Sequence, residues 1–139
     1  MVSFTKFNSF VEALAEKVHN LGADTLKVML TNSAPSASHS VKTDITEISA
    51  GNGYTAGGTQ ATVSSSSQTG GTYKLALNDV VFTASGGSIA SFRYAVLYND
   101  TATNDELIAY YDYGSSISPA SGETFTVDFD GTTGVLTLA

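Results

Sequence analysis

The sequence predicts a mainly β protein, an antiparallel β-sandwich or barrel-like fold with one amphipathic helix at its N-terminus. Two observations predict this fold class. From residue 26 onward, short runs of alternating apolar and polar residues are separated by turns rich in glycine. Before residue 22, apolar residues instead recur at the spacing of a helix. A chain of 139 residues fits one domain, so we expect residues 1–139 to form a single β-rich unit whose helix spans about 5–21.

The expected helix carries its apolar side chains on one face. These residues are Phe7, Phe10, Val11, Leu14, Val18 and Leu21. Ser9 and Glu12 have the spacing of a capping box at the start of the helix, and Ser3 and Thr5 are alternative caps. Gly22 is placed to end the helix. Such a helix would cover one open end of the sandwich or pack on one sheet.

The expected strands follow a period of two residues. They cover residues 26–30, 73–77, 92–98, 107–113, 125–129 and 135–138. The residues expected on one face of the run at 92–98 are Phe92, Tyr94, Val96 and Tyr98. The polar stretch at 31–40 is expected to be a loop, and residues 64–67 are either an exposed strand or a mobile loop.

The charge balance argues against partners that carry phosphate. The chain has 13 acidic and 6 basic residues, a formal net charge of −7, and the basic residues are scattered along it. Because an acidic surface repels phosphate backbones, we expect no nucleic-acid partner. Cysteine is absent, which excludes disulfides and zinc–thiolate sites. The sequence shows neither a signal peptide nor an apolar run long enough to span a membrane, so we expect synthesis in a cytoplasm and no membrane partner.

The stretch GNGYTAGG at 51–58 raises the question of a phosphate-binding loop. A dinucleotide-binding fingerprint requires a third glycine and a following helix, but Ala56 stands at the third position and the pattern after it is that of a strand. The Gly-Lys-Ser/Thr of a P-loop is also missing. We expect instead a tight loop whose glycines adopt positive φ angles and whose Tyr54 anchors it to apolar residues.

Candidate residues for catalysis or metal binding are few. His19 and His39 are the two histidines, and neither has an obvious nucleophile close to it in the sequence. Asp128, Asp130 and the segment 99–106 offer oxygen ligands of the kind that calcium prefers, but their spacing lacks the further ligands of a calcium loop, and such residues also favour turns. We therefore expect no catalytic residue, no cofactor, no metal site and no enzyme activity. A calcium site in the acidic loops and a hydrolase that uses His19 or His39 are the alternatives.

The tyrosines are the candidate contact residues. They are Tyr54, Tyr94, Tyr98, Tyr110, Tyr111 and Tyr113. Tyrosine is enriched at protein interfaces, and its ring also stacks on sugars. In a β-sandwich, a tyrosine can also belong to the core, with its ring buried and its hydroxyl reaching the edge of the core. The six residues are therefore predicted as a possible interface, with a core role and carbohydrate contact as alternatives.

Five segments of the chain resemble a known family. They are FNSFVE at 7–12, HNLGADTLKV at 19–28, EISAGNGYTAGG at 47–58, RYAVLYND at 93–100 and the stretch 125–139. These segments are similar to small virion structural proteins of tailed bacteriophages. The resemblance implies a capsid decoration (cement) protein that binds the major capsid protein on the outer surface of the phage head and stabilises it, as a homo-oligomer that is a trimer by analogy. A minor tail or fibre-associated protein that binds host-surface glycan is the alternative, and no catalytic residue comes with the resemblance.

Overall fold

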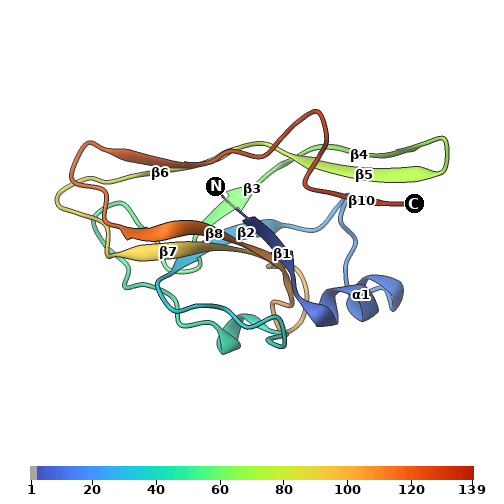
Figure 1. Ribbon diagram of the computed structural model, residues 1–139, viewed down its shortest axis with the longest axis horizontal. Helices are drawn as coiled ribbons and strands as arrows, with labels where there is room; N and C mark the ends of the chain where they lie inside the picture. Colours follow the sequence, from blue (N-terminus) through green and yellow to red (C-terminus); the bar gives the residue numbers. More distant parts are fainter. Residues whose placement is uncertain (1–2) are drawn as a thin grey trace.

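The computed structural model describes residues 3–139, which form two layers of antiparallel strands (Figure 1). In chain order the elements are β1 (Ser3–Lys6), α1 (Asn8–Ala15), β2 (Leu26–Thr31), the 3-10 helix η1 (Lys42–Asp44), β3 (Thr59–Ala61), β4 (Val63–Thr69), β5 (Thr72–Leu77), β6 (Val80–Thr83), β7 (Phe92–Asn99), β8 (Leu107–Ile117), β9 (Thr124–Val127) and β10 (Leu136–Leu138). The first layer is a five-stranded sheet in the order β1-β8-β7-β2-β3. The second layer contains the three-stranded sheet β10-β5-β4 and the pair β6-β9. The predicted mainly β fold with one short helix near the N-terminus is confirmed, and the packing of its layers is compatible with a sandwich.

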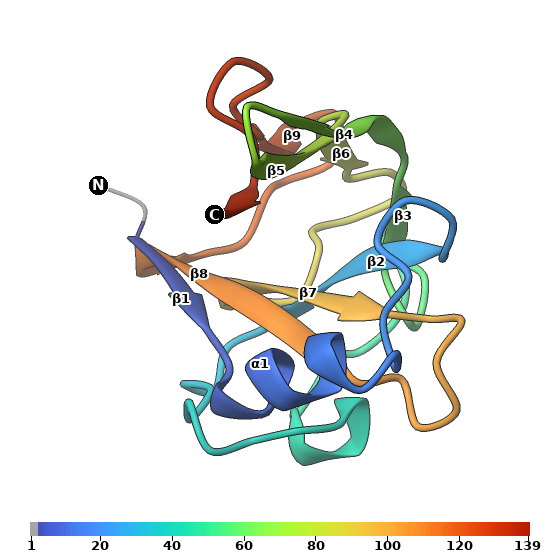
Figure 2. The same cartoon turned by 90° about the vertical axis from the view of Figure 1, so that its right-hand side faces the viewer.

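The main core lies between the two layers, which Figure 2 shows facing each other. Leu30 and Leu97 of the first layer belong to the same apolar cluster as Leu75 of the second. Phe92 is fully buried and meets Phe125 of the opposite layer edge to face, with ring centroids 4.8 Å apart. Each layer therefore turns one apolar face toward the other, as the period of two in the sequence predicts.

A smaller core covers the outer face of the five-stranded sheet. Met29, Val96 and Tyr98 lie on this side, and Phe7 and Ile45 pack against them. The long connection between β2 and β3, which includes η1, supplies part of this cover. Because β2 is buried on both faces, its sequence is apolar almost throughout instead of alternating.

The helix starts later than the sequence predicts. α1 covers Asn8–Ala15, whereas residues 3–6 form the edge strand β1. β1 pairs with β8, and the backbone amide of Phe7 donates a hydrogen bond to the carbonyl of Ile108, so the chain remains extended up to the first turn of the helix. Ser3 and Thr5 lie in this strand, and the prediction that either one caps the helix is wrong. The pairing partner lies a hundred residues away along the chain, so a local sequence pattern does not reveal it.

The helix also ends earlier than predicted. Phe7 is the N-cap residue and caps with no side chain, so the predicted capping box of Ser9 and Glu12 is wrong. The C-cap is Glu16, and Lys17 follows with a positive φ of 69°. Leu21 therefore reaches the interior from a turn, whereas Val18 is exposed, and the prediction that Gly22 ends the helix is wrong.

Phe92 lies on the inner face of its sheet, where the pairing of β7 with β8 is irregular. Phe92 pairs with Ile117 and Tyr94 with Asp112, so the extra residues at this irregularity belong to β8. Phe92 joins Ala95 in the main core. Val96 and Tyr98 lie in the outer core. The prediction that Phe92 shares a face with these two residues is therefore wrong, and nothing in the alternating pattern indicates the irregular pairing with β8.

The glycine-rich loop bends and packs against two strands. The glycines with positive φ in this loop are Gly51, Gly53, Gly57 and Gly58, as predicted. Tyr54 is 2% exposed and packs in the main core, which confirms its predicted role as the apolar anchor. A Cβ atom on Gly58 would overlap the backbone carbonyl of Val28 in β2, and one on Gly53 would overlap that of Thr83 in β6. Glycine is required at these two positions because the neighbouring backbone lies too close for a Cβ atom, and because other residues rarely adopt such positive φ angles.

The same loop completes the open edge of β2. β3 pairs with β2 only at residues 26–28, so Leu30 lies beyond this pairing. The hydroxyl of Tyr54 accepts a hydrogen bond from the Leu30 amide at 3.0 Å and donates one to Glu47 Oε1 at 2.6 Å. The amide of Gly57 donates to the same carboxylate oxygen at 2.5 Å. Burial raises the pKa of Tyr54, and its hydrogen bond to Glu47 raises it further, so the hydroxyl stays protonated and able to donate.

Candidate functional site: an aromatic groove

Two of the six predicted contact tyrosines are buried. Tyr54 is 2% exposed and Tyr98 is 0% exposed. Their hydroxyls bond inside the molecule, that of Tyr54 to Glu47 and that of Tyr98 to the carbonyl of Gly57 at 2.5 Å. Neither ring reaches the surface of the folded chain. The prediction that Tyr54 and Tyr98 belong to an interface is therefore wrong, and both serve in the core.

Tyr94 and Tyr110 lie together on the outer face of the five-stranded sheet. Their ring centroids are 6.5 Å apart, and both side chains are half-buried. The guanidinium of Arg93 lies 5.4 Å from the Tyr94 ring and donates two hydrogen bonds to Asp112, at 2.8 and 3.0 Å. This pair of hydrogen bonds lowers the pKa of Asp112 and holds the guanidinium in place. An interface role for Tyr94 and Tyr110 remains a prediction.

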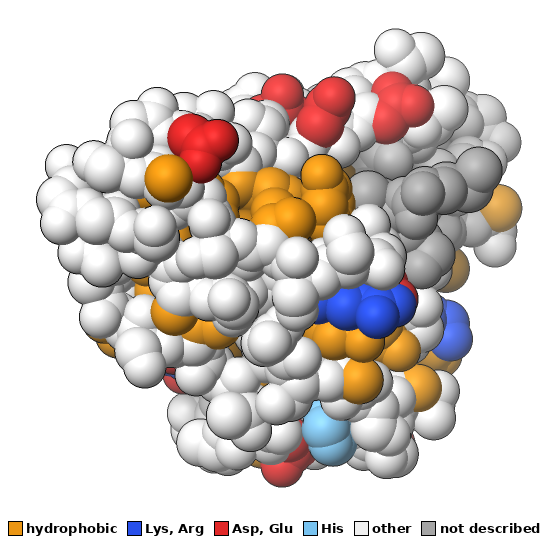
Figure 3. Space-filling view, turned by 60° about the vertical axis from the view of Figure 1, so that its left-hand side comes forward, with side chains coloured by type: hydrophobic (Ala, Val, Ile, Leu, Met, Phe, Trp, Pro, Cys, Tyr) orange, Lys and Arg blue, Asp and Glu red, His pale blue; other side chains and the backbone are white. Residues whose placement is uncertain are grey.

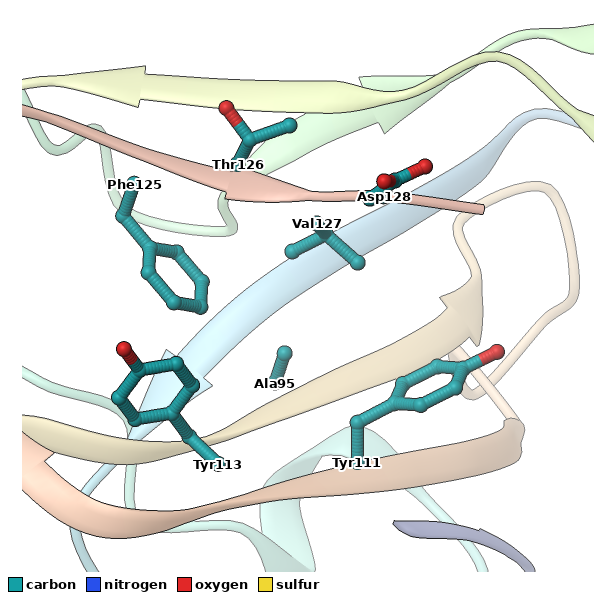
Figure 4. Close-up of a pocket in the computed structure, with 7 residues that line it drawn as sticks. All are labelled: Ala95, Tyr111, Tyr113, Phe125, Thr126, Val127 and Asp128. Atoms are coloured by element: carbon teal, nitrogen blue, oxygen red, sulfur yellow. The ribbon is translucent and has the colours of Figure 1, made fainter. Parts of the chain in front are cut away.

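Tyr111 and Tyr113 point the opposite way, into the space between the layers (Figure 4). Both come from β8, where alternation places them on the inner face. Phe125 and Val127 of β9 face them from the other layer. Together they line a pocket of about 140 Å³ that also reaches Asp128.

The pocket exists because one inner position of β7 carries a small side chain. Ala95 contributes a single methyl group between the two large rings of Tyr111 and Tyr113 (Figure 4). The walls are held by aromatic contacts: Tyr113 meets Phe125 edge to face at 5.5 Å, and Phe125 meets Phe92 at 4.8 Å. Such aromatic pairs stabilise one arrangement of the rings by more than their buried area alone would contribute. The cavity is therefore preformed in the folded chain.

A second pocket adjoins the first and extends it along the edge of the sandwich. It measures about 250 Å³, shares Tyr111 and Asp128 with the first pocket, and adds Phe4, Phe129 and Asp130. Tyr111 meets Phe4 edge to face at 5.5 Å and Phe129 at 5.9 Å. We call the two pockets together the aromatic groove.

Asp128 and Asp130 lie beside the aromatic groove, but the carboxylate of Asp128 points away from the first pocket, on the side of the chain opposite Phe125 and Val127 (Figure 4). Asp128 is exposed and, within residues 3–139, forms no hydrogen bond or ion pair. Asp130 accepts hydrogen bonds from the hydroxyl and amide of Thr133 and from the amide of Thr132, and these hold the pKa of its carboxyl below the usual range. On the face that Figure 3 displays, exposed hydrophobic side chains lie between acidic side chains above them and basic side chains below and to the right.

His19 is buried in the folded chain, where it is 5% exposed. Its Nδ1 lies 3.0 Å from the Asn99 Nδ2, and the Asn99 Nδ2 also donates to Asp24 at 2.6 Å. The Oδ1 of Asn99 accepts from the amides of Thr101 and Ala102, which fixes the amide orientation. His19 Nδ1 must therefore accept a hydrogen bond, so the ring is neutral and carries its proton on Nε2. Burial lowers the pKa of His19, although Glu106 and Asp24 act in the opposite direction.

We expect acid to destabilise the protein through His19. Its pKa is lowered in the folded chain from an ordinary value of 6.5, so below pH 6.5 the unfolded chain takes up a proton that the folded chain excludes. The free energy of unfolding should then fall by up to about 1.4 kcal/mol per pH unit as the pH drops below 6.5. Urea unfolding between pH 7.5 and 5.0 measures this slope. His19→Asn, whose side-chain oxygen is able to accept the bond from Asn99, should flatten it, and His39→Gln should not; equal slopes in all three proteins would refute the assignment.

Within residues 3–139, no group of catalytic or metal-binding side chains surrounds the other predicted sites. His39 accepts a hydrogen bond from the amide of Ser36 at 3.2 Å in the connection after β2. Among residues 3–139, no group of three or more histidine, aspartate or glutamate side chains is placed to hold a metal ion. In the same part of the chain, no helix has the length and apolar character that a membrane crossing requires.

Sequence reasoning found part of the aromatic groove and missed the rest. Tyr111 and Tyr113 were predicted as contact residues, and Phe125 was predicted on an alternating strand, but nothing local indicates that these rings meet. Ala95 was missed because a small residue between apolar neighbours carries no functional signal. The sequence predicts Asp128 only as a calcium ligand or a turn residue, and its place beside the aromatic groove follows from the packing of the two layers.

Comparison of the chain with protein-family models, with curated proteins and with solved structures finds no match.

Proposed function

We propose that the chain is a virion structural protein of a tailed bacteriophage, which binds the outer surface of the capsid as a decoration (cement) protein and stabilises the head. In this proposal it is not an enzyme, its partner is the major capsid protein, and it acts as a homo-oligomer that is a trimer by analogy. The resemblance of the five segments supports the proposal. The observation that carries it is the aromatic groove, a preformed apolar surface at the open edge of the fold.

The aromatic groove has the properties of a contact site. Interface residues with large binding effects are mostly aromatic or arginine side chains that fit into well-packed pockets. Tyr113 and Phe4 are 42% and 43% exposed, so their rings offer apolar area that a partner would bury. Because the neighbouring rings of Tyr111 and Phe125 are already fixed by edge-to-face contacts, little ordering remains to oppose binding.

Many copies on one shell would multiply a modest affinity. Each contact in an array keeps the other contacts of the same oligomer at high effective concentration, which raises the avidity without new interactions. An acidic chain with a net charge of −7 would suit a capsid surface that is locally basic. A decoration protein needs a rigid body and such contact surfaces.

We expect the protein to bind heads of the phage that encodes it, assembled after deletion of its gene. Co-sedimentation should saturate at many copies per head, and the decorated heads should resist heating better than bare ones. Tyr113→Ser removes an exposed ring of the aromatic groove and should weaken binding by about tenfold or more. Val81→Ser is the matched control, because Val81 is 50% exposed and lines neither pocket; a loss of binding equal to that of Tyr113→Ser would count against the groove. Failure of the unaltered protein to bind heads would count against the decoration role.

A tail or fibre-associated protein that binds glycan is the second candidate. The observation that favours it is the exposed ring of Tyr113 beside Phe125, since aromatic faces stack on sugar rings. Titration with methyl glycosides should then change the tyrosine fluorescence of the unaltered protein and leave that of Tyr113→Ser unchanged. No change with any sugar, together with binding to heads, would exclude this candidate.

A further inference from the structure

We propose that two copies of the chain associate through the apolar surface between α1 and β10, in a contact with two-fold symmetry. We call this surface the helix face, and it consists of Val11, Leu14, Val18, Leu136 and Leu138. The inference deepens the proposed function and rests on it for the homo-oligomer, because it names the surface on which copies meet. The trimer, which comes from analogy, would need a further contact elsewhere.

The helix face leaves large apolar side chains exposed. Val11, Val18 and Leu138 are 53%, 37% and 56% exposed. They belong to one surface, because Val11 lines one pocket and Val18 lines another, and both pockets include Leu14 and Leu138. Figure 1 shows α1 and β10 at the same end of the molecule. A contiguous exposed apolar patch of this kind is typical of a surface that a partner covers.

The charges around the helix face favour a second copy as this partner. The segment 6–18 contains the exposed residues Lys6, Glu12, Glu16 and Lys17, and within residues 3–139 none of them forms an ion pair. Their charges cancel, so the other 4 basic and 11 acidic residues hold the whole net charge of −7. Two copies that approach through the rest of their surfaces bring net negative charge together, whereas two helix faces meet without this repulsion.

The same charges argue against the capsid as the partner of the helix face. Lys6 and Lys17 line its two pockets. Asp24 also lines the pocket of Lys17, but its carboxylate accepts hydrogen bonds from the Asn20 amide at 2.8 Å and from the Asn99 side chain at 2.6 Å. A locally basic capsid surface, which would suit the acidic remainder of the chain, gains no attraction from these two lysines.

The strand β10 offers a second self-complementary feature beside α1. It is the terminal strand of the sheet β10-β5-β4, and in the part of the chain that the structure describes no strand pairs with its outer edge. The free backbone groups of such an edge pair with another strand. A second copy brings the same free edge to the contact, and antiparallel pairing of two identical edges has the two-fold symmetry of a dimer.

Sedimentation equilibrium of the isolated protein, from about 1 µM to 1 mM, tests this inference. We expect a monomer–dimer equilibrium, and Val11→Ser should weaken the dimer by about tenfold or more. Val81→Ser is the matched control, because Val81 is 50% exposed on β6 and lies outside the helix face, and it should leave the dimer unchanged. Circular dichroism checks that both variants fold, and Leu138→Ser, at a 56% exposed position, repeats the test from β10.

A charge exchange tests the electrostatic part of the inference. Lys6→Glu leaves each helix face with a net negative charge and should weaken the dimer by about fivefold or more at low salt, and by less at high salt. Adding Glu12→Lys to this variant restores the neutral face and should recover most of the affinity. A dimer that Lys6→Glu does not weaken, or that Glu12→Lys does not restore, would overturn the inference.

Other occupants of the helix face give different results. A protein that stays monomeric at every concentration would overturn the inference, and so would an oligomer that Val11→Ser leaves intact. Binding of the monomer to phosphatidylglycerol vesicles, lost in Val11→Ser, would assign the face to lipid instead. Dimers that do not bind phage heads would refute the decoration role and leave the helix-face contact standing, whereas a monomer that binds heads would do the reverse.

Discussion

Gly58→Ala is expected to leave little folded protein at room temperature. Gly58 has a φ of +79°, and a Cβ atom built on it overlaps the backbone carbonyl of Val28. Val28 lies in β2, which pairs with β3 on one side and with β7 on the other, so neither backbone is free to move aside. We expect the free energy of unfolding to drop by more than about 4 kcal/mol, which is comparable with the whole stability of many domains.

Gly70→Ala separates the two components of this effect. Gly70 has a similarly positive φ of +59° in the turn between β4 and β5, but nothing lies within 4 Å of a Cβ atom built there. The free energy of unfolding of Gly70→Ala should fall by only about 1–2 kcal/mol, which is the cost of the left-handed conformation for a residue with a Cβ atom. Urea unfolding followed by circular dichroism measures both variants. Similar losses in the two would mean that Gly58 is not wedged against β2.

Tyr54→Phe is expected to cost about 2–4 kcal/mol of unfolding free energy, although it removes a single oxygen atom. That oxygen accepts from the Leu30 amide, beyond the β2–β3 pairing, and donates to Glu47 at 2.6 Å. The substitution leaves a buried amide without its acceptor and a half-buried carboxylate without one of its donors. Tyr73→Phe is the matched control, because the Tyr73 hydroxyl meets Ser66 at an exposed position and should contribute well under 1 kcal/mol.

A double-mutant cycle tests whether Tyr54 and Glu47 act as one unit. Glu47→Gln keeps an acceptor for the Gly57 amide but removes the charge that strengthens both hydrogen bonds. The double variant should therefore lose clearly less than the sum of the two single losses. Additive losses, or a Tyr54→Phe effect as small as that of Tyr73→Phe, would contradict the view that this loop completes the edge of β2.

The sequence predicts much of this fold because much of it is locally encoded. The alternating runs place β5, β7, β8 and β9 correctly, and the glycines at 51–58 predict a bend with positive φ angles, which the chain has. The helix was predicted too long at both ends. Residues 3–6 pair with β8 far along the chain, and Leu21 enters the interior from a turn. Neither a distant pairing partner nor a turn that mimics helical spacing is visible in a local pattern.

The aromatic groove shows the same limit at the level of a site. Residue type alone predicts six tyrosines as contact residues, but the packing of the strands and of the glycine-rich loop decides which rings are accessible. Tyr54 and Tyr98 are buried, whereas Tyr111 and Tyr113 line a pocket. The partners from the other layer become visible only once the two layers are placed together. Residue type therefore suggested the chemistry of the site, and tertiary packing determined its members.

Cryo-electron microscopy of the intact particle tests the decoration role most directly. We expect density for this chain on the outside of the major capsid lattice, in many copies, with the aromatic groove turned toward the capsid protein. Density confined to the tail or its fibres would contradict the decoration role and favour glycan contact. Density on the head with the groove open to solvent would contradict the groove as the capsid-binding surface.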